Sequence, residues 1–249
     1  MKRAFTLIEM VLVLTVLAIV AHLAVNSLGT VRENRLRVAA DRQLDEIAVA
    51  AEAFLSDIGR LPKLAAMTND YGQEVMTLAE LWQRPSYLPM AAVTNVEGVL
   101  VVRGWNGPYL KLPQGESKLR DPWGNPIESP DAAGLNRLVA SADKRVVAVA
   151  HFGSRGQAID RVERSLLSES ELSGELVVTA IGADSCYCHE PHEGVDAAIK
   201  GVRANASQFL FTKLLAGEKT LAVTTTNGEH IVKSIRFKGP ARKVEIQLP

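Results

Sequence analysis

The chain lacks the features on which several classes of protein depend. Its 249 residues include only 2 cysteines, Cys186 and Cys188, too few for a disulfide framework. The 28 basic and 28 acidic residues cancel, so the net charge gives no indication of nucleic-acid binding. The G-x-S-x-G, H-E-x-x-H and phosphate-loop motifs are all absent. The sequence therefore predicts a protein that is not an enzyme.

Proline is absent between Phe5 and Gly59, and charge is scarce in the first half of that stretch. Residues 10–21 contain a single polar side chain, Thr15. The apolar run approaches the roughly 20 residues that a helix needs to span a bilayer. We therefore expect a transmembrane segment within residues 5–30.

Two basic residues, Lys2 and Arg3, precede the apolar run. Positive charge is favoured on the cytoplasmic side of a membrane, which places the N-terminus in the cytoplasm and the rest of the chain outside. A buried helix of a soluble core is one alternative, although such a helix rarely stands at the extreme N-terminus. A cleaved secretory signal is another, but no clean small-residue cleavage pair follows Val25. The sequence favours a retained, single-pass anchor.

From Arg32 onward the chain becomes amphipathic. Apolar residues recur at spacings of three and four, which is typical of a helix with one buried face. These residues are Leu36, Ala40, Leu44, Ile47, Ala51, Phe54 and Ile58. Gly59 followed by Pro62 is a stop signal. A single helix is therefore predicted over residues 5–58, with its second half packed on a globular head.

Short segments follow the predicted helix. Residues 59–135 are rich in proline and glycine, with a helix candidate at 75–84 and a strand candidate at 96–103. Residues 138–152 indicate two strands around a turn. The hydrophilic, Ser-rich stretch at 161–174 is the expected linker. Residues 31–160 are thus expected to form the head, including the second half of the helix.

Beyond the linker the composition is typical of strands. The β-branched and aromatic runs lie at 174–182, 209–215, 219–226, 230–237 and 243–248. Asn227 and Gly228 stand between two of these runs and are a strong hairpin signal. We expect a small antiparallel sandwich at residues 175–249. The predicted fold class is α+β: a long helix on a small antiparallel-sheet head, then an all-β domain.

The stretch KRAFTLIEM resembles the leader and anchor of type IV pilins and pseudopilins, in which a small residue precedes F-T-L-I-E. The resemblance implies a leader of residues 1–4, cut between Ala4 and Phe5 by a prepilin peptidase, and N-methylation of Phe5. Most such leaders end in glycine, whereas this one ends in Ala4. The resemblance also implies an inner-membrane location, with the head in the periplasm or outside.

Glu9 is the single charge within the apolar run. In the pilin family this glutamate pairs with the N-terminal amine of a neighbouring subunit, here that of Phe5 after cleavage. Such pairing is physically sound, because a carboxylate and an ammonium in low dielectric each need a partner. A glutamate that reaches headgroups or water at the membrane boundary is the alternative.

Three phrases of the head are similar to the major pseudopilin of type II secretion systems. They are FLSDIGRLP at 54–62, GWNGPYLK at 104–111 and DPWGNP at 121–126, in the order found in that family. The similarity extends over residues 1–128. We expect a packed structural corner, rather than a ligand surface, from Trp105, Gly107, Pro108, Tyr109, Asp121, Pro122, Trp123 and Gly124.

The same family carries a calcium-binding loop near the end of its head. The nearest equivalent in this chain is HFGSRGQAID at 151–160, where Ser154 and Asp160 are candidate calcium ligands. The central acidic pair of the family is absent and Arg155 lies in the loop. Calcium prefers several oxygen donors, so this site departs from the pattern that binds it.

One cluster near the C-terminus has the composition of a transition-metal site. Cys186, Cys188, His189 and His192 supply two thiols and two imidazoles to zinc or copper within seven residues. Zinc sites usually leave at least two residues between cysteines, and one short loop rarely closes a tetrahedron. A disulfide, free thiols and an irregular loop without a bound ion are the alternatives.

These observations predict a structural pilin-like subunit that assembles through its N-terminal helix into a periplasmic pseudopilus or pilus of a type II secretion-like system. Its expected partners are other copies of itself, other pilin-like subunits, the prepilin peptidase, the inner-membrane assembly platform and the lipid bilayer, with no nucleic acid. The alternative is a membrane-anchored binding module that displays its β-domain to a ligand, metal or exported protein. Type IV and competence pili share the anchor chemistry, so the sequence leaves the system open.

Overall fold

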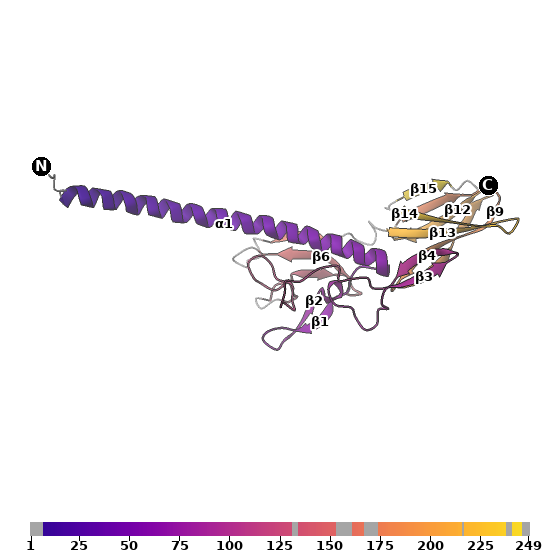
Figure 1. Ribbon diagram of the computed structural model, residues 1–249, viewed down its shortest axis with the longest axis horizontal. Coiled ribbons are helices and arrows are strands. Elements are labelled where there is room, and N and C mark those ends of the chain that lie inside the picture. The colour runs from indigo at the N-terminus through magenta and orange to yellow at the C-terminus, as the bar shows by residue number, and fades with distance from the viewer. Residues whose placement is uncertain are drawn as a thin grey trace.

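The computed structural model describes residues 7–130, 134–152, 161–166, 174–215, 217–237 and 241–245. A long helix, α1 (Leu7–Ile58), carries a small β-rich head along its second half. A second β-rich unit, the C-terminal domain, lies at the far end of the helix (Figure 1). The predicted α+β class with a β-rich C-terminal region is confirmed.

Helix α1 buries one face of its second half against the head. Ala40, Leu44, Ile47, Ala51, Phe54 and Ile58 are all buried. They follow the three- and four-residue spacing that the sequence shows, because side chains at that spacing lie on one side of a helix. The helix ends at Gly59, whose φ of 83° is the left-handed conformation of a helix C-cap. The Gly59 N–H donates to the Leu55 carbonyl at 2.8 Å.

Two hairpins and one short 3-10 turn follow the helix. The strands are β1 (Ala65–Thr68), β2 (Glu74–Thr77), β3 (Ala92–Val96) and β4 (Val99–Arg103), and the turn is η1 (Ala79–Leu81). The helix predicted at 75–84 is wrong, because residues 74–77 pair with β1 and only three residues keep a helical turn. The strand predicted at 96–103 is interrupted by Glu97 and Gly98, whose positive φ values form a tight turn.

The sheet packed on α1 is antiparallel, in the order β5 (Leu138–Ala140), β6 (Val146–His151) and β7 (Val162–Ser165). The two strands expected in 138–152 are present. Strand β7 lies inside the stretch expected to be a linker, 161–174. Its four side chains are exposed, so its composition is polar although its backbone pairs with β6. Residues 167–173 lie outside the described residues.

The C-terminal domain is a sandwich of two four-stranded sheets, ordered β10-β9-β13-β14 and β11-β12-β8-β15. Its strands are β8 (Gly174–Thr179), β9 (Ala183–His192), β10 (Val195–Lys200), β11 (Val202–Asn205), β12 (Gln208–Leu214), β13 (Gly217–Thr225), β14 (His230–Phe237) and β15 (Ala241–Glu245). The pairs are antiparallel except β15 with β8. Buried side chains from both sheets form one core, including Val178, Phe211, Leu221 and Phe237.

Asn227 and Gly228 lie in the turn between β13 and β14, as their hairpin signal predicts, and Gly228 has a φ of 82°. Strands β9, β10 and β11 were not predicted from the sequence. The polar and proline-containing composition of β9 is typical of a loop, although Cys186 and all of residues 188–191 are buried in the strand.

Candidate assembly site

The first half of α1 exposes apolar side chains on every side. Ten residues between Ile8 and Val20 are 44% to 75% exposed, namely Ile8, Met10, Val11, Leu12, Val13, Leu14, Val16, Leu17, Ile19 and Val20. Because successive residues of a helix are roughly 100° apart, a nearly continuous run of exposed residues covers its whole circumference. Exposed apolar surface of this extent marks a site of interaction. Glu9 lies in the first turn and is exposed.

The expected cleavage and methylation residues, Ala4 and Phe5, lie outside the described residues, as do the candidate calcium ligands Ser154 and Asp160. In the part of the chain that the structure describes, no helix has a stretch that is both long and apolar enough to cross a membrane. The transmembrane segment expected within residues 5–30 stays a prediction.

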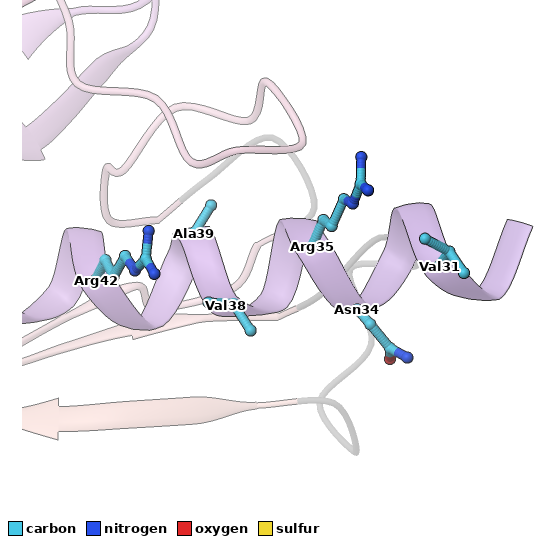
Figure 2. Close-up of a pocket in the computed structure, with 6 residues that line it drawn as sticks. All are labelled: Val31, Asn34, Arg35, Val38, Ala39 and Arg42. Atoms are coloured by element: carbon cyan, nitrogen blue, oxygen red, sulfur yellow. The ribbon is translucent and has the colours of Figure 1, made fainter. Parts of the chain in front are cut away.

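The second half of α1 has exposed side chains on the face opposite its buried one. Six of its residues line a shallow pocket of about 510 Å³: Val31, Asn34, Arg35, Val38, Ala39 and Arg42. Figure 2 shows Arg35 and Arg42 extending toward the same side of the helix. Val31 and Val38 are 47% and 51% exposed. This face lies away from the buried face, because Arg42 follows the buried Ala40 by two residues, or roughly 200° around the helix.

The phrases at 54–62 and 104–111 meet at the end of α1. The Tyr109 ring lies edge-on to Phe54 and to Trp105, with centroid distances of 5.5 and 5.7 Å. Its hydroxyl donates to Asp57 Oδ2 at 2.9 Å. Burial raises the pKa of the Asp57 carboxyl, and this effect outweighs the hydrogen bond from Tyr109, which lowers it. A Cβ at Gly107 would lie 2.6 Å from the Trp105 ring, so the loop before Pro108 lies directly on the indole.

The phrase at 121–126 forms a turn around a buried carboxylate. Asp121 Oδ1 accepts the backbone N–H groups of Trp123 and Asn125 at 3.0 and 2.8 Å. Asp121 Oδ2 accepts a hydrogen bond from Arg137 Nη1 at 2.9 Å, and both side chains are buried. Trp123 Nε1 donates to Glu33 Oε2 of α1 at 3.3 Å. The turn, which includes Pro122 and Gly124, is thus hydrogen-bonded to α1 through Trp123.

The cysteine and histidine residues of 186–192 do not come together in one site. They lie in strand β9, where successive side chains point to opposite faces. Cys186 and Cys188 face the sandwich core and are fully buried free thiols, and burial raises the pKa of each to about 12. His189 lies on the other face, and His192 is exposed at the end of the strand.

The structure therefore does not bring these four residues together in one group, and a zinc or copper site formed by them stays a prediction. The segment is a strand, so its alternation separates the thiols from His189, whose Nδ1 lies 2.7 Å from Asp196 Oδ2. Across the described residues, no group of three or more His, Cys, Asp or Glu side chains is arranged to hold a metal ion.

The turn between β9 and β10 joins the C-terminal domain to the end of α1. The Gly194 N–H donates to the Ile58 carbonyl at 3.0 Å. Glu193 Oε2 accepts a hydrogen bond from Arg60 Nε at 2.7 Å, and Arg60 Nη1 donates to Glu80 Oε2 at 2.8 Å. The Arg60 and Glu80 side chains are only 3% and 1% exposed. Arg60 therefore links the domain to the head through a largely buried ion-pair network.

A second link joins strand β4 of the head to strand β10. Arg103 Nε donates to Asp196 Oδ1 at 3.0 Å, and the two side chains are 8% and 16% exposed. The sequence contained no sign of either link, because Arg60 and Glu193 are 133 residues apart and follow no local pattern.

Comparison with known proteins finds a match to a family model at the start of the chain. Residues 1–25 match the family model described as the prokaryotic N-terminal methylation motif. The motif supports a type IV pilin-like prepilin leader, and it implies processing by a prepilin peptidase and assembly with other pilin subunits. No curated protein and no solved structure matches the chain. The head and the C-terminal domain lie outside the matched residues.

Proposed function

We propose that the chain is a pseudopilin, a structural subunit without catalytic activity that assembles through α1 into a periplasmic pseudopilus or pilus of a type II secretion-like system. One observation carries the proposal. The methylation motif at residues 1–25 includes the start of α1, where the apolar side chains between Ile8 and Val20 are exposed on every side of the helix. Such a surface is stable when lipid or the helices of other subunits cover it.

Residues 5–30 hold the subunit in the inner membrane before assembly, with the N-terminus in the cytoplasm. Lys2 and Arg3 support this orientation. The C-terminal domain is attached at the end of α1 farthest from the motif (Figure 1). We expect it on the outside of the fibre, where its bulk does not interfere with the packing of the helices. The head phrases shared with major pseudopilins favour secretion over a type IV or competence pilus.

The mature N-terminus gives the most direct test. Mass spectrometry of the protein purified from membranes is expected to show loss of residues 1–4 and a methylated Phe5. The reason is that the leader ends at Ala4 and the family peptidase cuts at this position. An N-terminus that still begins at Met1 would contradict the proposal.

The Glu9→Leu variant tests assembly. It is expected to insert into the membrane normally but to be absent from fibres, because the Phe5 amine of the neighbouring subunit would be buried without its carboxylate partner. The matched control is Thr15→Leu, which removes a polar group from the same segment without removing a charge. Electron microscopy and immunoblotting of sheared fibres measure the outcome. Normal fibres from Glu9→Leu would refute the pairing.

A further inference from the structure

The outer edge of strand β4 has no pairing partner in the part of the chain that the structure describes. Strand β4 pairs only with β3, through a hairpin whose two turn residues, 97–98, both have positive φ. Such a turn makes Val96 and Val99 a hydrogen-bonded pair, and hydrogen-bonded pairs alternate along an antiparallel ladder. The backbone N–H and C=O groups of Leu100 and Val102 therefore point away from β3, toward the outer edge.

This edge lacks the features that usually prevent a strand from pairing with another chain. Protected edges carry lysine or proline, contain a bulge, or are covered by another element. The residues of β4 before Arg103 are all apolar, and the Leu100 and Val102 side chains are 71% and 49% exposed. The register between β3 and β4 is regular throughout. An unprotected apolar edge of this kind is a template for an added strand.

A polar pocket of about 280 Å³ lies beside this edge, close to the end of α1 (Figure 1). Residues 100–103 line it on one side, and residues of α1, β13 and β14 line it on the others. Three lining residues, Ser56, Thr220 and Ser234, carry hydroxyls that make no hydrogen bond within the described residues. One water needs only roughly 10–15 Å³ of such space, so the pocket can hold a segment of chain.

The side chain of Arg103 contributes a buried donor without an acceptor. Arg103 lines the pocket and is 8% exposed. Its Nε donates to Asp196 Oδ1 at 3.0 Å, and its Nη1 contacts the Val102 carbonyl oxygen at 3.4 Å. Its Nη2 is buried and has no hydrogen-bond partner among the described residues. A buried charged donor without an acceptor is destabilising, so a ligand that supplies an acceptor is bound favourably.

We propose that this pocket binds an extended peptide segment, which adds a strand to the outer edge of β4. The peptide backbone pairs with Leu100 and Val102, and one peptide carbonyl oxygen accepts a hydrogen bond from Arg103 Nη2. A peptide backbone fits because it carries donors and acceptors at the regular spacing that a strand edge requires. This binding site goes beyond the pseudopilin role and does not depend on assembly.

The charges around the pocket favour a neutral peptide backbone over an anion. The two cations that line it, Arg103 and Lys219, are already paired with Asp196 and Glu190, at 3.0 and 2.8 Å. Asp57 adds a carboxyl group to the lining. An anionic ligand would therefore meet no unpaired positive charge, whereas a carbonyl oxygen needs only the N–H of Arg103 Nη2.

Binding of a synthetic peptide to the full-length protein in detergent tests the proposal. The probe is a fluorescein-labelled pentapeptide of alternating threonine and valine with blocked ends, since both residues favour strands. We expect saturable binding by fluorescence anisotropy, because backbone hydrogen bonds supply the affinity in strand addition. The control is the same peptide with N-methylated backbone amides, which cannot pair and should not bind. No binding, or equal binding of the two peptides, would overturn the proposal.

Two proline variants of the hairpin locate the site. Val102→Pro removes an N–H from the outer edge of β4 and should weaken peptide binding tenfold or more. Val93 lies directly opposite Val102, so Val93→Pro removes an N–H from the other edge of the same hairpin and should change the affinity less than twofold. Proline is tolerated in an edge strand where its nitrogen faces away from the ladder, so both variants should fold. Equal losses of affinity would contradict binding at β4.

Arg103→Lys tests the role of the buried donor. Lysine keeps a cation opposite Asp196 but lacks Nη2, so we expect about tenfold weaker binding, the effect of one hydrogen bond to a charged group. Unchanged affinity would overturn the role of Arg103.

Hydrogen exchange of the unmodified protein provides a test that no substitution can disturb. The bound peptide should slow exchange of the backbone N–H groups of Leu100 and Val102, because both become hydrogen-bonded. Unchanged exchange of these groups would overturn the proposal. So would protection in the absence of peptide that is lost on dilution, since it would show that a second copy of the chain occupies the edge.

Discussion

At the scale of the residue, burial determines whether the two thiols of β9 can react or bind a metal. Cys186 and Cys188 have the composition of a metal site with His189 and His192, but their side chains lie between the two sheets. A thiol binds metal and reacts as the thiolate. With a pKa raised to about 12 by burial, each remains protonated near neutral pH.

We therefore predict that neither thiol is alkylated by iodoacetamide at pH 8 in the folded protein, and that both are alkylated in urea. Mass spectrometry counts the adducts. A Val38→Cys variant supplies an exposed thiol as the control and should be labelled in the folded state. Rapid labelling of Cys186 or Cys188 in the folded protein, or its suppression by added zinc, would contradict the buried placement.

At the scale of the element, the end of α1 is determined by one glycine. Gly59 adopts a φ of 83°, and a Cβ there would lie 1.8 Å from the Pro191 carbonyl oxygen. Gly228 in the β13–β14 turn has almost the same φ, but nothing lies within 4 Å of its Cβ position. The two glycines thus share the backbone requirement and differ in the space around them.

We predict that Gly59→Ala lowers the free energy of unfolding more than Gly228→Ala does. The left-handed conformation costs about 1–2 kcal/mol at each position. At Gly59 the added methyl group must also displace the backbone of β9, for a total loss of about 3 kcal/mol or more. Urea denaturation of the two variants measures the difference. Equal losses would show that the domain is not packed against the helix end as described.

Elements with strong local patterns were predictable from the sequence. The buried face of α1 follows from regular apolar spacing, and the β13–β14 hairpin follows from Asn227 and Gly228. The strand β9 was not predictable, because Pro191 and the charged residues around it are typical of a loop. Its strand conformation is stabilised by pairing with β10 and β13 on either side, which no local pattern reveals.

The candidate site was predictable to a similar extent. Glu9 and the apolar run follow from sequence alone, since both lie within one continuous segment. The link from Arg60 to Glu193 depends on how two distant segments fold together, so composition and spacing carry no signal of it. The same is true of the Arg103–Asp196 pair.

At the scale of the whole molecule, the buried ion pairs make the head and the C-terminal domain one unit. We predict a single cooperative transition in calorimetry of the unmodified protein. The double variant Asp196→Ala, Glu193→Ala should divide this single transition into two. Arg103 would remain buried without its carboxylate partner, and Arg60 would lose one of its two carboxylate partners. Glu229→Ala, in the exposed β13–β14 turn, is the control and should leave one transition. Two transitions in the unmodified protein would contradict the coupling.

The attachment of the C-terminal domain to the last turn of α1 also has a mechanical consequence. The helix has 52 residues and is therefore about 78 Å long. A lateral force on the domain acts on the N-terminal end of α1 with a lever arm of that length. A force along the helix axis is transmitted to the N-terminal end through the backbone hydrogen bonds of α1, which run parallel to that axis. In the proposed assembly, a force on the C-terminal domain would therefore be transmitted along α1 to its N-terminal end.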